Sequence, residues 1–240
     1  MNLVENQNTP FKSSPLGRQP LLVEGVRIKI CCISSILEAK QAISFGASAL
    51  GLVAKMPSGP GPISDELIKE IVRTIPPPIA SFLLTSRTDS LAIIEHQKLV
   101  NSNTVQIVDA LMSGSYEDFR RYIPAIKIVQ VIHVIDEKTL DEALEISEKV
   151  DALLLDSGNP NLAVKQLGGT GRVHNWAISR KIVEQSKIPV FLAGGLKAEN
   201  VRAAIDAVQP FGIDLCSSVR TDGHLDLFKL EKFFEEVNRI

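Results

Sequence analysis

Eight short apolar runs, each followed by a stretch with helical periodicity, constrain this chain more than any other feature of its sequence. The runs are rich in β-branched residues, and the stretches between them repeat apolar residues every three or four positions. The expected strands are Val26–Ile33, Ser48–Ala54, Pro78–Leu84, Thr104–Val108, Lys127–Val134, Ala152–Asp156, Pro189–Ala193 and Gly212–Cys216. The expected helices are Ile36–Phe45, Asp65–Ile75, Asp89–Leu99, Tyr116–Tyr122, Glu137–Lys149, Trp176–Gln185, Glu199–Val208 and Asp226–Asn238. Strict alternation of this kind is typical of βα units with parallel strands.

Eight consecutive units in about 215 residues predict an α/β fold of the (β/α)₈ type, a TIM barrel that forms a single domain. The alternative is an open doubly wound sheet, which usually begins with a glycine-rich dinucleotide loop after its first strand. Here that place is taken by Ile30–Ser35, which reads ICCISS, so the barrel is favoured. Residues 26–240 form the predicted barrel, and residues 1–25 form a polar N-terminal extension that is expected to be mobile. Ser35, Ser64 and Thr88 are the expected N-caps of the first three helices.

Composition excludes several classes of partner. Lys and Arg number 26 against 28 Asp and Glu, a formal net charge of −2, so no nucleic-acid or membrane-surface partner is expected. No run approaches the roughly 20 apolar residues that span a bilayer. Three cysteines cannot form a disulfide framework, and with no secretory signal evident the expected location is cytoplasmic. The four histidines show no metal-ligand spacing, so we expect neither a metal nor a cofactor.

In a barrel the active site lies at the carboxyl ends of the strands, and three of these ends predict a phosphate site. Gly168–Gly171 lies in the loop after the sixth strand, where backbone N–H groups could turn toward one anion; a flexible loop is the alternative. Gly194 and Gly195 end the seventh strand, and Asp214, followed by Ser217–Ser218, ends the eighth. Barrel enzymes often hold a phosphate between these loops and a helix N-terminus, so the expected ligand is a small phosphorylated sugar.

Two titratable side chains stand at the same edge. Asp156 follows a leucine run, so partial desolvation would raise its pKa and suit it to proton donation, whereas a turn-capping role is the alternative. Cys31 ends the first strand, and strict alternation would place it on one face with Lys29 and Ile33, opposite Cys32. A nearby ammonium would favour the thiolate, although a free cysteine is often only a small buried hydrophobe.

Four motifs in the right order resemble the phosphoribosylanthranilate isomerase family of tryptophan biosynthesis, from about Val26 to the C-terminus. Lys29–Ser34 is similar to the family's Lys-Ile-Cys-Gly-Ile-Thr. The other matching segments are Asp151–Ser157, Gly168–Gly171 with Asn175-Trp176, and Phe191–Leu196 with Glu199–Val201. The resemblance implies a cofactor-free Amadori rearrangement of N-(5-phosphoribosyl)anthranilate to the carboxyphenylamino-deoxyribulose phosphate, with Asp156 as general acid and Cys31 as general base.

The resemblance and the strand-end analysis together predict one set of substrate-binding and phosphate-binding residues. These are Lys29, Gln106, Gly169, Thr170, Gly171, Gly194, Gly195, Asp214, Ser217 and Ser218. The protein is expected to be a monomer or a homodimer.

The loop after the second strand departs from the family. Where the family carries an Arg that binds the anthranilate carboxylate, this chain has Gly61, and the other cations in strand-end loops are Arg172 and Arg220. If the missing cation is the only change, Gly61→Arg should lower the KM. The alternatives are a related barrel for a different phosphorylated aminosugar, and a phosphosugar-binding protein without turnover.

Overall fold

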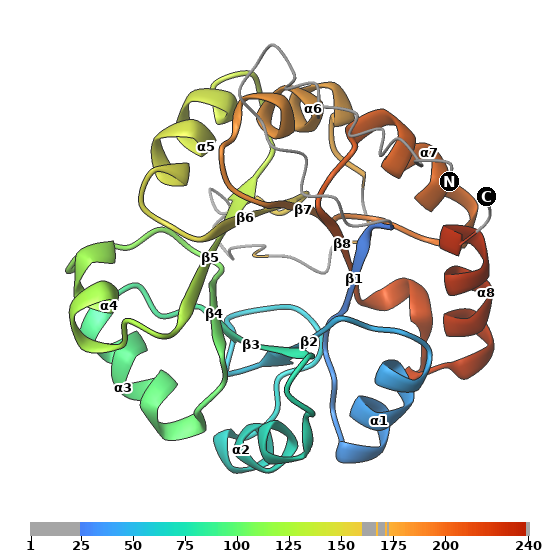
Figure 1. Ribbon diagram of the computed structural model, residues 1–240, viewed down its shortest axis with the longest axis horizontal. Helices are drawn as coiled ribbons and strands as arrows, with labels where there is room; N and C mark the ends of the chain where they lie inside the picture. The colour runs from blue at the N-terminus through green and yellow to red at the C-terminus, as the bar shows by residue number, and fades with distance from the viewer. Residues whose placement is uncertain (1–24, 160–166, 168–170, 172, 239–240) are drawn as a thin grey trace, which may run out of the picture.

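The chain forms a closed barrel of eight parallel strands inside a ring of helices (Figure 1). The structure is a computed structural model that describes residues 25–159, 167, 171 and 173–238. The strands are β1 (Arg27–Ile30), β2 (Ala49–Val53), β3 (Ala80–Thr85), β4 (Thr104–Ile107), β5 (Lys127–His133), β6 (Ala152–Asp156), β7 (Val190–Leu192) and β8 (Gly212–Leu215). The helices are α1 (Ile36–Ser44), α2 (Asp65–Thr74), α3 (Ser90–Val100), α4 (Tyr116–Tyr122), α5 (Thr139–Ser147), α6 (Trp176–Gln185), α7 (Ala198–Val208) and α8 (Leu227–Asn238).

The barrel follows chain order, because each strand pairs in parallel with the next and β8 closes onto β1. The closing register sets Lys29 of β1 opposite Asp214 of β8. All eight predicted βα units are confirmed, and closure of the sheet excludes the open doubly wound alternative. The predicted extension lies outside the described residues, except for Gly25.

Side-chain caps begin the first three helices, two of them as expected. Ser35 Oγ accepts the N–H of Glu38 at 3.1 Å, and Ser64 Oγ accepts that of Leu67 at 3.2 Å. The expectation of Thr88 as the third cap is wrong by one position. Asp89 takes this role, because its extended backbone directly precedes the first helical residue and its carboxylate accepts the N–H of Ala92 at 2.8 Å.

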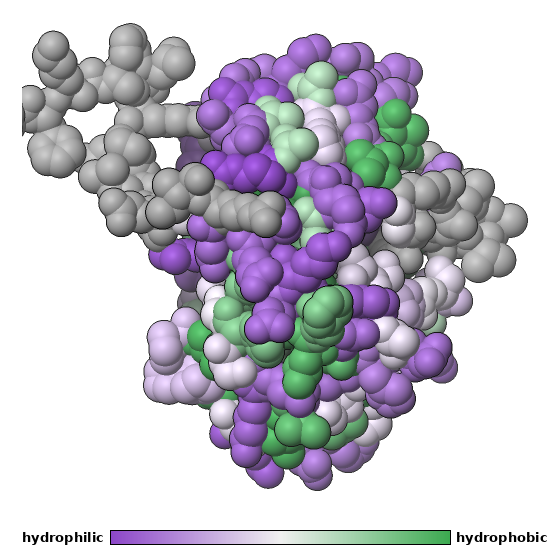
Figure 2. Space-filling model, turned by 90° about the vertical axis from the view of Figure 1, so that its right-hand side faces the viewer, coloured by the Kyte–Doolittle hydropathy of each residue, from purple (hydrophilic) through white to green (hydrophobic). Residues whose placement is uncertain are grey.

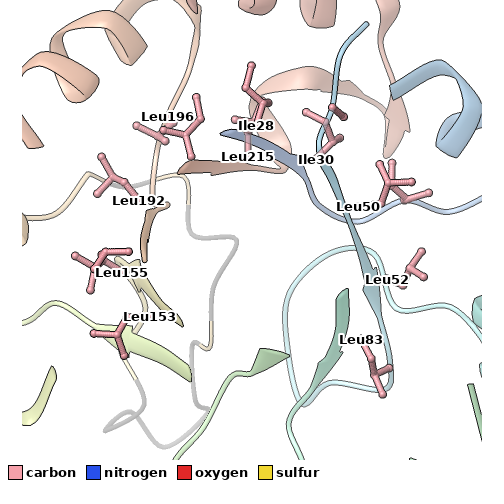
Figure 3. Packing of buried hydrophobic residues seen from close by; sticks show 14 of the residues in the cluster. Ile28, Ile30, Leu50, Leu52, Leu83, Leu153, Leu155, Leu192, Leu196 and Leu215 are labelled. Atoms are coloured by element: carbon pink, nitrogen blue, oxygen red, sulfur yellow. The ribbon is translucent and has the colours of Figure 1, made fainter. Parts of the chain in front are cut away.

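Two apolar layers hold the barrel together. The outer layer fills the space between strands and helices, and Figure 3 shows side chains such as Leu50, Leu153 and Leu192 placed around the barrel wall. The inner layer fills the barrel itself with residues such as Phe82, Leu154 and Phe191. Because side chains alternate along each strand, one strand supplies both layers: Leu153 and Leu155 of β6 face the helices, whereas Leu154 faces the interior.

The segment after β8 is more ordered than a plain loop. A short 3₁₀ helix, η1 (Ser217–Val219), follows the strand and leads into a two-stranded hairpin of β9 (Arg220–Thr221) and β10 (His224–Leu225). The sequence analysis does not predict these elements, because two-residue strands carry no detectable periodicity. They place η1 directly at the mouth of the barrel.

The outer surface is mixed in polarity. Figure 2 shows one side of the molecule, where mostly hydrophilic residues surround separate hydrophobic patches. Within the described ranges, no helix is both long and apolar enough to cross a bilayer.

Candidate active site

A cavity with an empty volume of about 770 Å³, part of it open to solvent, occupies the carboxyl ends of the strands. It brings together side chains and backbone from the ends of seven strands, all but β5, that lie far apart in the sequence. The predicted site residues in its wall are Cys31, Gln106, Asp156, Gly171, Gly194, Gly195, Asp214, Ser217 and Ser218. Gly169 and Thr170, which belong to the predicted phosphate loop, lie outside the described residues.

Cys31 lies in the cavity wall just after β1, with its N–H donating to Leu215 O at 2.8 Å. The expected alternation beyond it is wrong. Cys32 adopts a left-handed φ of 62°, which turns the chain, so Cys32 also faces the cavity and Ile33 packs in the outer layer. The family's glycine at this position would take the same conformation without strain.

Cys31 is also less acidic than the sequence suggests. Burial raises the pKa of its thiol to about 11, and Asp214 adds to this rise, whereas Lys29 and Arg220 oppose it. Lys29 favours the thiolate, as expected, but its ammonium is already paired with the Asp214 carboxylate and does not outweigh burial.

Lys29 is fully buried beneath the cavity rather than in its wall. Its Nζ donates to Asp214 Oδ1 at 2.9 Å and lies 5.3 Å from the centre of the Phe82 ring. Burial alone would lower the pKa of Lys29, but Asp214 and Cys31 outweigh it and the pKa is raised. Burial also raises the pKa of the Asp214 carboxyl, even with Lys29 beside it.

Asp156 ends β6 and is almost fully buried at the cavity wall. Burial raises the pKa of its carboxyl, and the opposing effects of Ser157, His133 and Lys29 do not cancel that rise. The turn-capping alternative is also realised, since Asp156 Oδ1 accepts the N–H of Ser157 at 2.7 Å. One oxygen therefore fixes the orientation of a carboxyl group that tends to keep its proton.

The predicted phosphate loops meet at one edge of the cavity. Gly171, Gly194 and Gly195 adopt left-handed φ values of 66°, 82° and 63° and lie in the wall with the start of η1. A side chain at Gly194 would crowd this edge, because its Cβ would lie 3.0 Å from Ser157 Oγ and 3.1 Å from His174 Nδ1. Ser218 Oγ is buried and has no hydrogen-bond partner, which leaves it available to an anion.

The sequence analysis missed His174, which sits beside this edge. Burial lowers the pKa of its imidazole to about 4, so the ring is neutral at physiological pH. Its Nε2 lies 2.8 Å from Ser179 Oγ, so it supports the start of α6. No spacing pattern in the sequence distinguishes it from the other histidines.

The wall formed by β2, β3 and β4 is mainly apolar. Val53, Met56, Leu84 and Val108 line it, together with the amide of Gln106. The Oε1 atom of Gln106 is buried without a hydrogen-bond partner. In the part of the chain that the structure describes, neither Lys nor Arg contributes to the cavity wall.

Arg220 does not reach the cavity, so its expected role as a cation for a substrate carboxylate is wrong. Its buried guanidinium donates to both carboxylate oxygens of Glu38, at 3.1 and 3.2 Å. It also donates to the backbone oxygens of Cys31, at 3.2 Å, and of Cys32. Arg220 thus holds the loop after β1, and the other expected cation, Arg172, lies outside the described residues.

A disulfide joins Cys32 to Cys216 across the cavity mouth, linking the loop after β1 to the end of β8. The sequence analysis expects no disulfide framework, and this single bridge connects residues 184 positions apart that only barrel closure brings together. Cys31 is the free cysteine. Gly61 packs against Cys32 with a φ of 85°, and a Cβ on it would lie 2.6 Å from Cys32 Cβ, so an arginine there has no room.

Metal binding finds no support in the described ranges, where no group of three or more His, Cys, Asp or Glu side chains could hold an ion.

Comparison with known proteins gives consistent matches along the whole barrel. The model of the family described as N-(5'-phosphoribosyl)anthranilate (PRA) isomerase matches residues 28–236. N-(5'-phosphoribosyl)anthranilate isomerase of Methanosarcina acetivorans is 35% identical over 224 residues, covering 88% of this chain and 92% of the relative. Isomerase 2 of Methanosarcina mazei is 37% identical over 212 residues, covering 87% and 92%.

Solved structures of the same kind of isomerase also match this chain. The crystal structure of phosphoribosyl anthranilate isomerase from Thermotoga maritima superimposes with a TM-score of 0.74 at 28% identity, covering 88% of this chain and 98% of that one. A structure of the isomerase in complex with reduced 1-(o-carboxyphenylamino)-1-deoxyribulose 5-phosphate superimposes with a TM-score of 0.71 at 26% identity and the same coverage.

Proposed function

Because this chain belongs to the N-(5'-phosphoribosyl)anthranilate isomerase family, we propose that it isomerises N-(5'-phosphoribosyl)anthranilate to the corresponding aminoketose phosphate in tryptophan biosynthesis. The observation that carries the proposal is that Cys31 and Asp156 lie in the wall of one cavity together with the glycine-rich edge predicted to bind a phosphate. Both side chains come from different strand ends, so they can reach different atoms of one bound sugar.

Asp156 acts as the general acid in this proposal. Burial raises the pKa of its carboxyl group and so favours the protonated form, and the proton passes to the ring oxygen of the ribose as the bond from C1 to that oxygen breaks. The nitrogen lone pair forms a double bond to C1, which leaves a positive charge on nitrogen.

Cys31 acts as the general base. Its thiolate removes the proton from C2, the electrons of that bond form a C1–C2 double bond, and the nitrogen regains its lone pair. The resulting enol then takes up a proton at C1 and gives up its hydroxyl proton to yield the aminoketose. The step needs neither a metal nor an oxidant, because only protons move.

The phosphate would be held by backbone N–H groups of the glycine-rich edge and by Ser218. Left-handed glycines let successive N–H groups converge on one anion, and α7 begins directly behind Gly194 and Gly195. Ser217 and Ser218 add donors from η1. We expect inorganic phosphate or sulfate to bind at this edge.

A second candidate substrate is a phosphorylated aminosugar whose aromatic or apolar part lacks a carboxylate. The wall of Val53, Met56 and Leu84 favours it, because a buried carboxylate needs charged or multiple donors and no Lys or Arg among the described residues lines the cavity. We place the protein in the cytoplasm as a monomer or homodimer, in keeping with a biosynthetic enzyme of small metabolites.

The test is turnover of N-(5'-phosphoribosyl)anthranilate made in situ, beside the aniline analogue that lacks the carboxylate. Asp156→Asn and Cys31→Ala should each lower kcat by ~10²-fold or more, the usual scale of general acid-base catalysis. Asp109→Asn is the matched control, because Asp109 is also buried at a strand end and also accepts the N–H of the following residue. Normal turnover in both variants would refute the assigned roles, and a preference for the analogue would favour the second substrate.

A further inference from the structure

A buried ion pair lies directly beneath the proposed base, and fold stability alone does not account for it. Lys29 and Asp214 face each other across the β1–β8 closure with 2.9 Å between Nζ and Oδ1, inside the barrel next to the inner apolar layer. Replacing such a pair by apolar residues is often neutral or stabilising, because both charges lose their hydration. The pair therefore calls for a role in the site.

The ammonium of Lys29 also adjoins the sulfur of Cys31. Gly51 of β2 shows this, since a Cβ built on it would lie 2.8 Å from Cys31 Sγ and 3.0 Å from Lys29 Nζ. Both atoms therefore occupy the space that any larger residue at position 51 would fill. Lys29 is thus placed between a carboxylate and a thiol that both compete for its charge.

Cys31 needs a charged neighbour such as Lys29, because its thiol must lose its proton before it can act as a base. The thiol of Cys31 holds its proton tightly in this buried position, and the Asp214 carboxyl has a raised pKa, so it is a ready proton acceptor. The charged and titratable groups that act on these two are Lys29, Arg220 and Asp156.

We propose that Lys29 and Asp214 are positioning residues that set the ionisation of Cys31: the thiolate forms when Asp214 takes up a proton and leaves the Lys29 ammonium to the sulfur. This inference rests on the proposed role of Cys31 as the base. A proton of Lys29 Nζ passes to Asp214 Oδ1, and the Sγ–H proton of Cys31 passes to Lys29 Nζ. Lys29 remains an ammonium, Asp214 becomes a carboxylic acid, and the new thiolate keeps Lys29 as its counter-ion.

The experiment measures the rate of alkylation of Cys31 by iodoacetamide against pH, which needs no substrate. Asp214→Asn frees the charge of Lys29 for the thiol, so alkylation at pH 8 should become about tenfold faster, one pKa unit. Lys29→Met removes the counter-ion, so alkylation should slow by about tenfold or more. The acid limb of the kcat profile should move in the same two directions, with KM changed little.

Opposite shifts separate this role from a structural one, because loss of packing would make Cys31 more accessible in both variants. The double variant Lys29→Met/Asp214→Asn removes both charges of the pair, so neither is left unpaired to disturb folding, and it should alkylate as slowly as Lys29→Met. Asp109→Asn should leave the pH profile unchanged. Equal shifts in both single variants, or none in Asp214→Asn, would overturn the inference.

Gly51→Ala provides a test without a change of charge. The added methyl group should force Sγ and Nζ apart, raise the midpoint of the alkylation profile and lower kcat. Gly212→Ala is the matched control, because its Cβ would lie 2.6 Å from the Phe191 ring but outside the cavity wall. If Gly51→Ala and Gly212→Ala had the same midpoint in the alkylation profile, the placement of Lys29 beside the thiol would be overturned. Full turnover by Cys31→Ala would instead refute the proposed base and leave the alkylation results standing.

Discussion

Alanine in place of Gly61 tests how tightly the loop after β2 is locked against the loop after β1. Gly61 has a φ of 85°, and a Cβ on it would lie 2.6 Å from Cys32 Cβ and 3.1 Å from Cys32 Cα. Cys32 cannot give way easily, because the disulfide to Cys216 and the hydrogen bond from Arg220 to its carbonyl both hold it. The substitution therefore strains two loops at once.

The loss of stability expected for Gly61→Ala has two parts. A side chain in the left-handed region costs roughly 1–2 kcal/mol. Forcing a methyl group into a filled site costs a further ~1–3 kcal/mol. The expected loss of stability is thus about 2–5 kcal/mol, and the displaced loop should also raise the KM, because Ser58–Pro60 line the cavity.

Gly223→Ala separates the two parts. Gly223 has a φ of 81°, but a Cβ on it would meet nothing within 4 Å, so only the backbone cost of about 1–2 kcal/mol applies. Melting temperatures of the two variants should differ by about 2–4 °C for each kcal/mol of the difference. Dithiothreitol should narrow the gap, because a reduced Cys32 can move. Equal melting temperatures in the oxidised protein would refute the packing argument, and a lower KM in Gly61→Arg would show that the loop accepts a side chain.

Three further predictions concern the same corner of the barrel. Arg220→Met should destabilise the protein by about 3–5 kcal/mol, because it leaves the carboxylate of Glu38 buried without its partner. Burial opposes ionisation of Glu38, but hydrogen bonds from Arg220 and two backbone N–H groups outweigh it and lower the pKa of Glu38 in the folded state. The contribution of Glu38 to the free energy of unfolding is therefore complete above its ordinary pKa of 4.5 and is lost as the pH falls through its folded pKa. The stability of Glu38→Gln, measured by urea unfolding, should therefore fall less in acid than that of the wild type. Reduction of the Cys32–Cys216 disulfide should lower the free energy of unfolding by about 2–5 kcal/mol, since it releases a closed loop of 184 residues. Cys216→Ser should melt at the same temperature as the reduced wild type, with or without dithiothreitol.

Local patterns in the sequence determined the fold and half of the candidate site. Eight β-branched runs separated by amphipathic stretches leave a closed barrel as the natural arrangement, because each strand needs a helix to cover one face. Chain order then assigns the residues after each run to the barrel mouth, which is how Cys31, Asp156 and the Gly194–Gly195 turn could be predicted as neighbours.

Tertiary structure decided what those residues can do. Whether Cys31 is a thiol or a thiolate depends on burial and on Asp214, which pairs with Lys29 from 185 residues further along the chain. The role of Arg220 also depends on the tertiary structure: the sequence suggests a free cation, but the side chain is bound to Glu38, 182 residues away. Electrostatic energies and packing depend on distances through space, and barrel closure sets these distances between segments whose spacing along the chain carries no trace of them.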